Sequence, residues 1–475
     1  MNSFFFYDLE TSGTNPRTSR IMQFGGQRTD LDLKPLGKPY NVYIKMTEDI
    51  LPDPEAIMIT GITPQKTLAD GLTEAEFLKL FHKEIATPGT IFVGFNSVRF
   101  DDEFMRFLHY RNFYDPYEWQ WLGDKSRWDL LDVSRMTRAL RPEGILWPVG
   151  SDGKNSNKLE LLASINKLKH RSAHDALSDV EVTIELAKLL KNKQPKLFDY
   201  LLNLRNKRRV QEVVSKEKLF VYTSGKYSGE FEKTTVVTVL SEHPQGQAVL
   251  VYDLRHDPEA FLSMSPEQIA EAWKYTKDET AIRLPVKTLK FNRCPAIAPL
   301  GVLNEKSLER LNIDLNVFEK HRQKLDGKFS QKVLKALEIM DKKRQTSLVY
   351  DEQDIDGLLY DDFFPKQDQA IMRAVRLAEP TEIKPEDFTF KDTRLKTLLP
   401  LYKARNYPKS LNKEEHFAWR QFIERKLTRG GEKSPIALYK TRIKELGQRT
   451  DLTLNQKGSL DDLIRWEKKI ELVIN

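Results

Sequence analysis

The chain begins with an apolar strand that ends in two carboxylates. Residues Phe4–Tyr7 are all aromatic, and Asp8 and Glu10 follow at positions two apart. Side chains at alternate positions of a strand point to the same face, so these two carboxylates should converge. Converging carboxylates repel each other unless a cation lies between them, and a divalent metal ion that prefers oxygen ligands fits there. The alternative is an acidic strand end that dips into solvent, which is the better interpretation of an arbitrary pair of this kind.

Two later segments carry acidic residues where a helix begins. Ile91–Phe95 has the pattern of a buried strand, and after a polar turn a helix is predicted from Asp101. The second of these segments leads into a strongly periodic helix, which is predicted over Ser178–Leu190. His174 and Asp179 lie five positions apart, which is about 140° around a helix. They can share a site only if His174 lies at or before the first turn.

Taken singly these motifs are weak, but in this order they resemble the metal site of the DEDD exonucleases. The His-x4-Asp spacing resembles the DEDDh branch. The residues that the resemblance carries over are Asp8, Glu10, Asp101, His174 and Asp179. Further segments are similar to those of the bacterial exodeoxyribonuclease I family: Gly61–Gln65, Asn96–Asp102, Tyr110–Tyr117, Arg127–Val133, Leu140–Gly144, Leu197–Leu201 and Tyr402–Pro408. The resemblance spans nearly the whole chain and is less specific between about residues 225 and 390.

Phosphodiester hydrolysis needs a nucleophilic water and a leaving oxygen whose charge is neutralised, and two divalent ions about 4 Å apart meet both needs. We assign Asp8 as the ligand that bridges the two ions. Glu10 and Asp179 complete the coordination of the ion on the side of the nucleophile. Asp101 is expected to help hold the second ion. His174 would be the general base, because a free pKa of about 6.5 suits that role. Mg²⁺ is expected, and Mn²⁺ should substitute for it.

Asp102 and Asp175 adjoin the chosen residues and are rivals for the same roles. We interpret Asp175 as supporting the start of a helix, and Asp102 as an acid behind the site or on the surface. The similarity of Arg99–Asp102 to the family segment favours Asp101 as the ligand.

Aromatic residues alternate with arginines between about residues 106 and 128. This pattern is typical of single-strand binding, where bases stack on rings and guanidinium groups neutralise phosphates. Core packing is the alternative, and for Trp119 and Trp128 the two interpretations are even. The resemblance implies substrate contacts by Glu10, Arg106, Tyr117, Trp121, Arg135 and Lys158. Lys158 stands where the family has an arginine, so the charge stays but the forked pair of donors is lost.

The excess of positive charge is concentrated in one segment. The chain has a net charge of +7, and Lys191–Lys218 contains nine basic residues against three acidic ones. Such a run is usually a solvated helix face or a linker. At a domain junction beside a nuclease-like fold, a phosphate-binding stripe is comparably plausible.

A length of 475 residues predicts two or three domains. The first predicted domain, residues 1–195, has strands at 3–8, 21–28, 41–45 and 91–95, followed mostly by helices, which resembles an α/β RNase H-like exonuclease domain. Residues 196–345 carry short β-branched runs separated by turns, with helices at 266–275 and 304–310, and are predicted to form an SH3-like β-barrel domain. Residues 346–475 are predicted to form an α-helical C-terminal domain. Its helix 413–428 carries a ridge of apolar residues expected in the core: Phe417, Trp419, Phe422, Ile423 and Leu427.

The leading hypothesis is a 3′-to-5′ exonuclease that processively degrades single-stranded DNA to nucleoside 5′-monophosphates in DNA repair or recombination. A single-strand DNA-binding scaffold without catalysis is disfavoured by the intact acidic set. A DEDDh exoribonuclease is disfavoured by about 280 residues beyond one nuclease domain. The preference for DNA over RNA rests on the resemblance alone.

The resemblance also implies a protein partner, the acidic, phenylalanine-ended tail of single-stranded DNA-binding protein. Such a tail needs an apolar pocket with cations, including an arginine for its terminal carboxylate. Arg141 and Tyr200 are the candidates, although local pairing of Arg141 and packing of Tyr200 are at least as plausible. The single cysteine, Cys294, and the lack of a stretch of about 20 apolar residues favour the cytoplasm, which the resemblance makes bacterial. We also expect a monomer.

Overall fold

The computed structural model describes residues 2–168, 175–274, 281–347 and 354–474. Contacts divide the chain into two compact units. The first combines Met1–Ser126, His170–Ile184 and Asp351–Asn475, and the second combines Arg127–Lys169 and Glu185–Tyr350. Each unit is therefore built from segments that are distant in the sequence. His174 lies outside the described residues.

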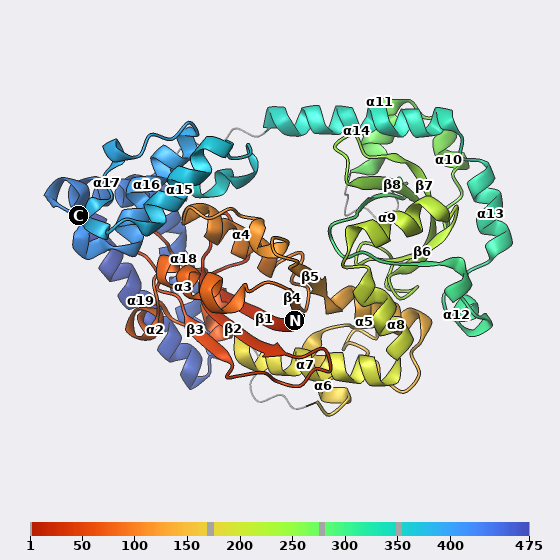
Figure 1. Ribbon diagram of the computed structural model, residues 1–475, viewed down its shortest axis with the longest axis horizontal. Coiled ribbons are helices and arrows are strands. Elements are labelled where there is room, and N and C mark those ends of the chain that lie inside the picture. The colour runs from red at the N-terminus through yellow and green to blue at the C-terminus, as the bar shows by residue number, and fades with distance from the viewer. Residues whose placement is uncertain (1, 169–174, 275–280, 348–353, 475) are drawn as a thin grey trace. The chain divides into compact units, whose positions relative to one another are not determined.

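A five-stranded sheet with the order β3-β2-β1-β4-β5 organises the first unit, and its edge strand β5 spans the unit boundary at Ser126 (Figure 1). The strands are β1 (Ser3–Thr11), β2 (Ile21–Thr29), β3 (Tyr40–Tyr43), β4 (Thr90–Gly94) and β5 (Ser126–Asp129). Central strand β1 pairs antiparallel with β2 and parallel with β4. Its aromatic side chains bury against β2, β4 and the helices, and Phe5 contacts the rings of both Phe24 and Phe92. The aromatic start of the chain is thus a buried central strand.

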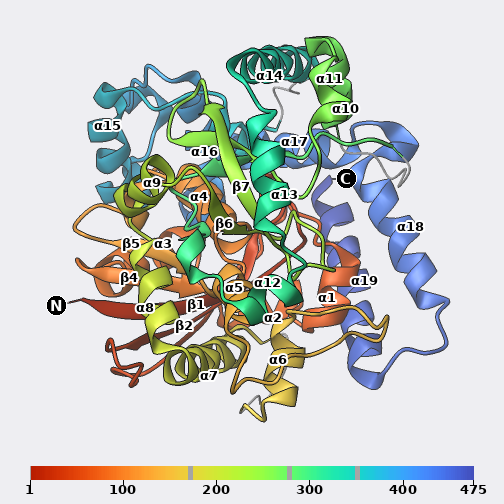
Figure 2. The same ribbon diagram turned by 90° about the vertical axis from the view of Figure 1, so that its right-hand side faces the viewer.

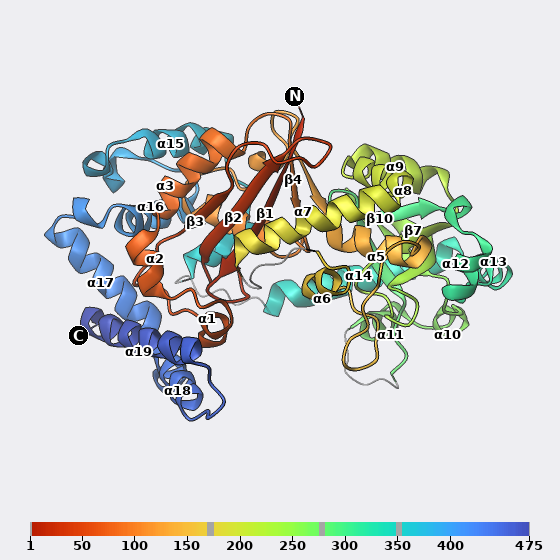
Figure 3. The ribbon, with the colours of Figure 1, turned by 90° about the horizontal axis from the view of Figure 1, so that it is seen from below.

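Short helices follow β3 and connect the strands. They are α1 (Pro54–Thr60), α2 (Pro64–Asp70), α3 (Glu74–Leu80) with its π-helical continuation (Phe81–Ile85), α4 (Asp101–Arg111) and a 3-10 turn (Glu118–Gln120). Thr73 and Glu76 form a reciprocal cap that fixes the start of α3. Helix α7 (Ala176–Lys193) begins beside the sheet, and Figure 3 shows it running across β2 and β1.

The C-terminal part of the first unit is helical. Its longer helices are α15 (Lys366–Leu377), α16 (Thr393–Asn406), α17 (Lys413–Thr428), α18 (Pro435–Gly447) and α19 (Leu454–Ile474), preceded by the 3-10 segment Ile355–Tyr360. They share one core with residues of the sheet-bearing part, including Met46 and Phe113. The predicted ridge of α17 is wrong at Phe417, which is 63% exposed, because only the face bearing Trp419, Ile423 and Leu427 turns inward.

The second unit contains an antiparallel five-stranded sheet with the order β10-β6-β7-β8-β9. Its strands are β6 (Phe220–Thr223), β7 (Thr234–Glu242), β8 (Ala248–Asp253), β9 (Val286–Lys290) and β10 (Ala296–Pro299). The helices of the unit are α5 (Leu130–Leu140), α6 (Leu159–Ile165), α8 (Pro195–Asn203), α9 (Lys207–Lys216), α10 (Glu259–Leu262), α11 (Pro266–Trp273), α12 (Glu305–Arg310), α13 (Leu315–Gln323) and α14 (Gly327–Ser347). Helix α14 packs against α11, and Figures 1 and 2 show the two side by side. The sequence had not predicted α13 or α14.

Candidate active site

Strand β1 brings Asp8 and Glu10 to one face of the sheet. The side chains that alternate with them, Tyr7 and Leu9, are buried in the core, whereas both carboxylates are half-buried. On the neighbouring strand β2, Gly25 lies opposite Asp8 and Gln23 lies opposite Glu10. The two carboxylates therefore converge as the strand's alternation predicts.

Helix α7 supplies the third carboxylate, because β2 leaves room for its first turn. A Cβ on Gly25 would lie 2.4 Å from the carbonyl carbon of Ala176 and 2.5 Å from the nitrogen of Leu177. Buried Gln23 fixes the same turn, since its Oε1 accepts a hydrogen bond from the Ala176 amide at 3.3 Å. This close approach places Asp179, in the first turn of α7, beside the strand carboxylates.

The three carboxylates form a cluster with metal-ligand spacing. One oxygen each from Asp8, Glu10 and Asp179 can be chosen so that all lie within 4.8 Å of one another. Ligand oxygens on opposite sides of a Mg²⁺ ion lie about 4.2 Å apart, given bonds of about 2.1 Å. Among the described residues no basic side chain pairs with Asp8 or Glu10. Hard oxygen donors that converge at this spacing fit a divalent ion.

The electrostatics of the cluster lead to the same conclusion. Burial raises the pKa of Asp8 well above its usual value, and the charges of Asp101, Glu10 and Asp179 raise it further. Burial and then Asp179 and Asp175 raise the pKa of Glu10 to about 8. Carboxylates with such pKa values hold their negative charge at neutral pH only when a cation compensates it.

The geometry at the start of α4 distinguishes Asp101 from Asp102. Both are buried, but an oxygen of Asp102 accepts a hydrogen bond from the Tyr7 hydroxyl at 2.5 Å, on the core side of β1. Asp101 is the largest single charge acting on Asp8. Asp101 thus lies on the face of β1 that carries the acidic cluster, whereas Asp102 connects α4 to the core face of β1.

Asp175 caps helix α7. Its Oδ1 accepts from the Ser178 amide at 3.1 Å, and its Oδ2 accepts from Gln23 Nε2 at 2.9 Å. Both oxygens are therefore engaged by the protein, while the charge of Asp175 still raises the pKa of Asp8 and Glu10. The assignment of His174 as general base stays a prediction, because that residue lies outside the described ranges.

The residues predicted to contact substrate in the first unit differ in exposure. Trp121 is 58% exposed and Tyr117 is half-buried, whereas Arg106 is 5% exposed. The guanidinium group of Arg106 donates to Glu103 at 2.6 Å and to Gln120 at 3.0 Å. Trp119 and Trp128 are 1% and 2% exposed, so core packing is the correct interpretation for both.

Two further predicted contacts lie in the second unit. Lys158 is exposed and lines a cavity of about 1210 Å³, together with residues of the loops 149–156 and 228–233. Arg135 is mostly buried, and its guanidinium group binds Asp132 at 2.7 Å. Of the two, Lys158 is the side chain that remains open to an incoming phosphate.

The predicted partner residues also lie in the second unit. Arg141 donates to the carbonyl oxygens of Leu140 at 2.6 Å and Val302 at 2.8 Å. The Tyr200 hydroxyl is buried without a hydrogen-bond partner among the described residues, and burial together with Glu217 raises its pKa to about 12. The basic segment 191–218 forms the end of α7, α8 and α9.

Gln23, Gly25 and Tyr7 position the acidic cluster, and the sequence reasoning missed all three. The roles of Gln23 and Gly25 depend on the β1–β2 register and on the distant helix α7, and that of Tyr7 depends on the start of α4. The paired glycines Gly25 and Gly26 inside a predicted strand were the available signal, because glycine there often marks a close approach of another backbone.

Three family models match successive parts of the chain. The model described as Exonuclease matches residues 5–187, the Exonuclease I SH3-like domain matches residues 205–338, and the Exonuclease I C-terminal domain matches residues 353–470. Together with the acidic cluster, they define the class of protein as an exonuclease that depends on a divalent metal.

Relatives define the family more narrowly. Exodeoxyribonuclease I of Haemophilus influenzae is 38% identical over 433 residues, which is 90% of each chain. Solved structures of exonuclease I from Methylocaldum szegediense and from Escherichia coli with a dA16 oligonucleotide are 38% and 36% identical to this chain. Both superpose with a TM-score of 0.92, covering 100% and 99% of this chain and all of theirs. The chain belongs to the exodeoxyribonuclease I family.

The family assignment confirms the predicted enzyme class, a DNA exonuclease, and the predicted sequence of folds. The predicted domain boundaries at residues 195 and 345 stay predictions. Within the described ranges, no helix combines the length and apolar composition that a membrane span requires.

Proposed function

We propose that this protein degrades single-stranded DNA from the 3′ end and releases nucleoside 5′-monophosphates. The convergence of Asp8, Glu10 and Asp179 within 4.8 Å is the observation that carries the proposal. A DNA-binding scaffold has no use for such a cluster, because converging carboxylates repel the phosphate backbone. The E. coli relative solved with a dA16 oligonucleotide supports a single strand as the substrate.

The proposed cofactor is a pair of Mg²⁺ ions, for which Mn²⁺ can substitute. Asp8, Glu10 and Asp179 would hold one ion, and Asp8 and Asp101 would hold the other. When bound, such ions lower the pKa of the attacking water and neutralise the leaving oxygen. A related E. coli exonuclease I, 35% identical to this chain, has been solved with zinc and single-stranded DNA, which supports a divalent ion in the family.

The protein's own residues orient the substrate and move the proton. His174 would accept the proton of the attacking water. Tyr117 and Trp121 would stack on bases near the end of the strand, and Lys158 would contact a phosphate. Glu10 would contact the last nucleotide beside the metal ion. The buried guanidinium groups of Arg106 and Arg135 reach a phosphate only if they exchange their present acidic partners.

The proposed partner is single-stranded DNA-binding protein, whose acidic tail would contact Arg141 and Tyr200. One solved relative, 35% identical to this chain, is a structure of SSB and exonuclease I in complex with the inhibitor CFAM. We further propose processive action by a monomer in the bacterial cytoplasm, where bacterial DNA lies.

Digestion of end-labelled substrates tests the activity. Single-stranded DNA, duplex DNA and RNA of one sequence, labelled at the 5′ end, are incubated with Mg²⁺ or with EDTA. The proposal predicts progressive shortening of single-stranded DNA with Mg²⁺ only. Equal digestion of RNA would identify an exoribonuclease, and binding without shortening would identify a scaffold.

A further inference from the structure

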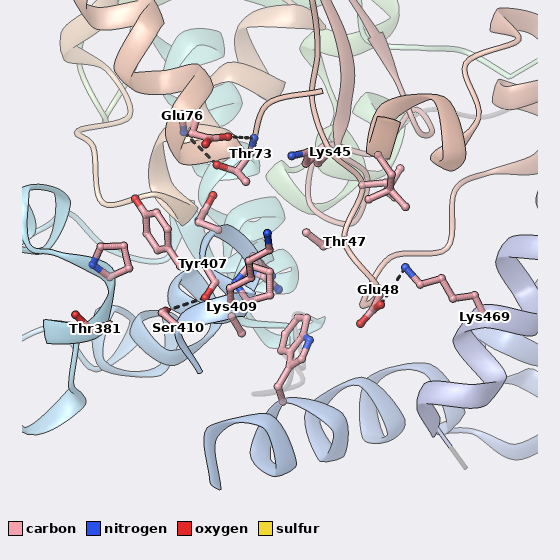
Figure 4. Close-up of a pocket in the computed structure, with 18 residues that line it drawn as sticks. Lys45, Thr47, Glu48, Thr73, Glu76, Thr381, Tyr407, Lys409, Ser410 and Lys469 are labelled. Carbon is pink, nitrogen blue, oxygen red and sulfur yellow. Dashed lines mark hydrogen bonds and ion pairs between the residues drawn. The ribbon is translucent and has the colours of Figure 1, made fainter. Parts of the chain in front are cut away.

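A cavity of about 630 Å³ lies within the first unit, away from the acidic cluster. The loop after β3, the start of α3, the end of α16 and helices α17 and α19 all contribute to its lining. Figure 4 shows Lys45 and Lys409, which are distant in the sequence, at the edge of this one space. The volume is typical of pockets that take small ligands or one anchoring side chain.

Most of the lining is apolar. Met46, Leu68, Pro380, Pro408 and Trp419 all face the cavity. The indole ring of Trp419 stacks on Phe422 with 5.6 Å between ring centres, so the core holds it in place. A rigid aromatic wall of this kind favours an apolar side chain as the occupant.

Three donors in the lining lack acceptors. The Nζ atoms of Lys45 and Lys409 have no ion-pair or hydrogen-bond partner among the residues that the structure describes. Within the same described ranges, the indole N–H of Trp419 also has no acceptor, although the residue is only 8% exposed. The cavity therefore combines an apolar interior with donors for an anionic group.

The acceptors of the lining are already engaged. Glu48 pairs with Lys469 at 3.1 Å, and Glu76 accepts from the Thr73 amide at 2.8 Å. The side-chain oxygen of Asn406 accepts from the Ala75 amide, and that of Thr73 accepts from the Glu76 amide. A nucleotide would bring amino and hydroxyl donors that find few free acceptors here. The cavity instead fits a ligand that presents apolar surface and carboxylates.

We propose that this cavity docks a short acidic peptide segment of a partner protein. One aromatic or aliphatic side chain of the peptide enters beside Trp419, and flanking carboxylates bind Lys45 and Lys409. The two lysines without ion-pair partners complement the negative charge of such a segment, which favours an acidic peptide as the ligand. The site is separate from Arg141 and Tyr200, and the proposal does not depend on the catalytic function.

Fluorescence anisotropy with a defined probe tests the site. The probe is a fluorescein-labelled, amidated peptide with one phenylalanine between two pairs of glutamates. The test variant is Lys45→Glu/Lys409→Glu. The matched control, Lys79→Glu/Lys83→Glu, makes the same change in net charge at exposed positions that do not line the cavity. Nuclease activity close to wild type shows that each variant is folded. If the double variant does not fold, Lys409→Glu alone is the test variant.

The proposal predicts saturable binding by the wild type that weakens by at least about tenfold in the test variant and by less than about twofold in the control. A peptide with alanine in place of phenylalanine should also bind more weakly. Absence of saturable binding to the wild type, or equal weakening in both double variants, would overturn the proposal. Displacement of the peptide by a lower concentration of a deoxynucleoside 5′-monophosphate would make the cavity a nucleotide site instead.

Discussion

Two uncharged residues of β2 set the geometry of the acidic cluster. Gly25 lets the first turn of α7 approach the strand opposite Asp8, and Gln23 binds that turn through the Ala176 amide. Position 25 has no positive φ, so glycine is needed there for space and not for its backbone conformation. The distance between Asp179 and the strand carboxylates therefore depends on the absence of one methyl group.

Gly25→Ala should separate catalysis from binding. The new methyl group would push α7 away from β2, and a shift of about 1 Å in a catalytic group can cost about 10²-fold in rate. We expect kcat to fall by about that factor while affinity for single-stranded DNA changes little. Gly301→Ala is the matched control, because a Cβ there meets nothing within 4 Å. A Gly25→Ala enzyme with normal kcat would show that α7 does not need this approach.

The acidic cluster should make the metal-free protein sensitive to alkaline pH. The pKa of Glu10 rises from 4.5 to about 8 on folding, so the folded state binds more protons between these values. Its contribution to stability is present below pH 4.5 and is lost as the pH rises through 8. In EDTA, the Tm of the wild type should fall more between pH 5 and 8.5 than the Tm of Glu10→Gln. Mg²⁺ should remove the difference, and equal falls in EDTA would contradict the assigned pKa.

Helices and strands are predicted best where the apolar pattern of a segment directly reflects which of its side chains are buried. The aromatic run of β1, the start of α4 and the bounds of α17 follow directly from apolar periodicity and helix starts. Helices α13 and α14 were missed because the β-branched runs before them led to the prediction of a β-barrel for the whole region. Phe417 was placed in the core because periodicity gives an apolar ridge but not how much of that ridge a neighbouring helix covers.

A buried histidine pair joins the end of α3 to α4. The Nε2 atoms of His82 and His109 lie 3.0 Å apart, and the ring of His82 stacks on Tyr114. Burial, followed by Arg376 and Lys125, lowers the pKa of His82 to about 3. Burial and the neighbouring His82 lower the pKa of His109 well below its usual value. Both rings are therefore neutral in the folded protein at neutral pH.

The histidine pair should make the protein sensitive to acid. The unfolded state binds more protons below a pH of about 6.5, so stability falls as the pH drops from there toward 3, by about 1.4 kcal/mol per pH unit for each proton. His109→Gln should flatten the dependence of the free energy of unfolding on pH between 6.5 and 4.5, measured by urea denaturation. Exposed His416→Gln is the control and should leave the slope unchanged. An unchanged slope in His109→Gln would contradict the lowered pKa.

At the scale of the whole molecule, a buried ion network makes the C-terminal helices part of the nuclease unit. Arg405 binds Asp356 and Asp49, each at 2.8 Å, and Arg20 binds Asp356 at 2.6 Å. The backbone of Arg20 is hydrogen-bonded to Ser12, just beyond the strand that carries Asp8 and Glu10. Asp356, from the C-terminal part of the chain, thus braces the loop that follows β1. The sequence could not show this network, because it joins Arg20 and Asp49 to residues more than 300 positions later in the chain.

Arg405→Ala should destabilise the protein by about 3–5 kcal/mol, because it leaves Asp49 and Asp356 buried with too little positive charge. Urea denaturation gives the free energy of unfolding. Arg420→Ala, on the exposed face of neighbouring α17, should change it by less than about 0.5 kcal/mol. Equal stability of the two variants would mean that the remaining cations, Arg20 and Lys426, suffice for the two aspartates.

Release of a labelled 3′-terminal nucleotide from single-stranded DNA tests whether Asp8, Glu10 and Asp179 hold the catalytic metal. The wild type, Asp8→Asn, Glu10→Gln and Asp179→Asn are compared with Mg²⁺, with Asp70→Asn as an exposed control. Binding of the same strand is measured in parallel by anisotropy. The account predicts that all three cluster variants bind the strand but release no nucleotide, whereas the control keeps the wild-type rate. Near-normal release by any one of the three would contradict the metal-site assignment.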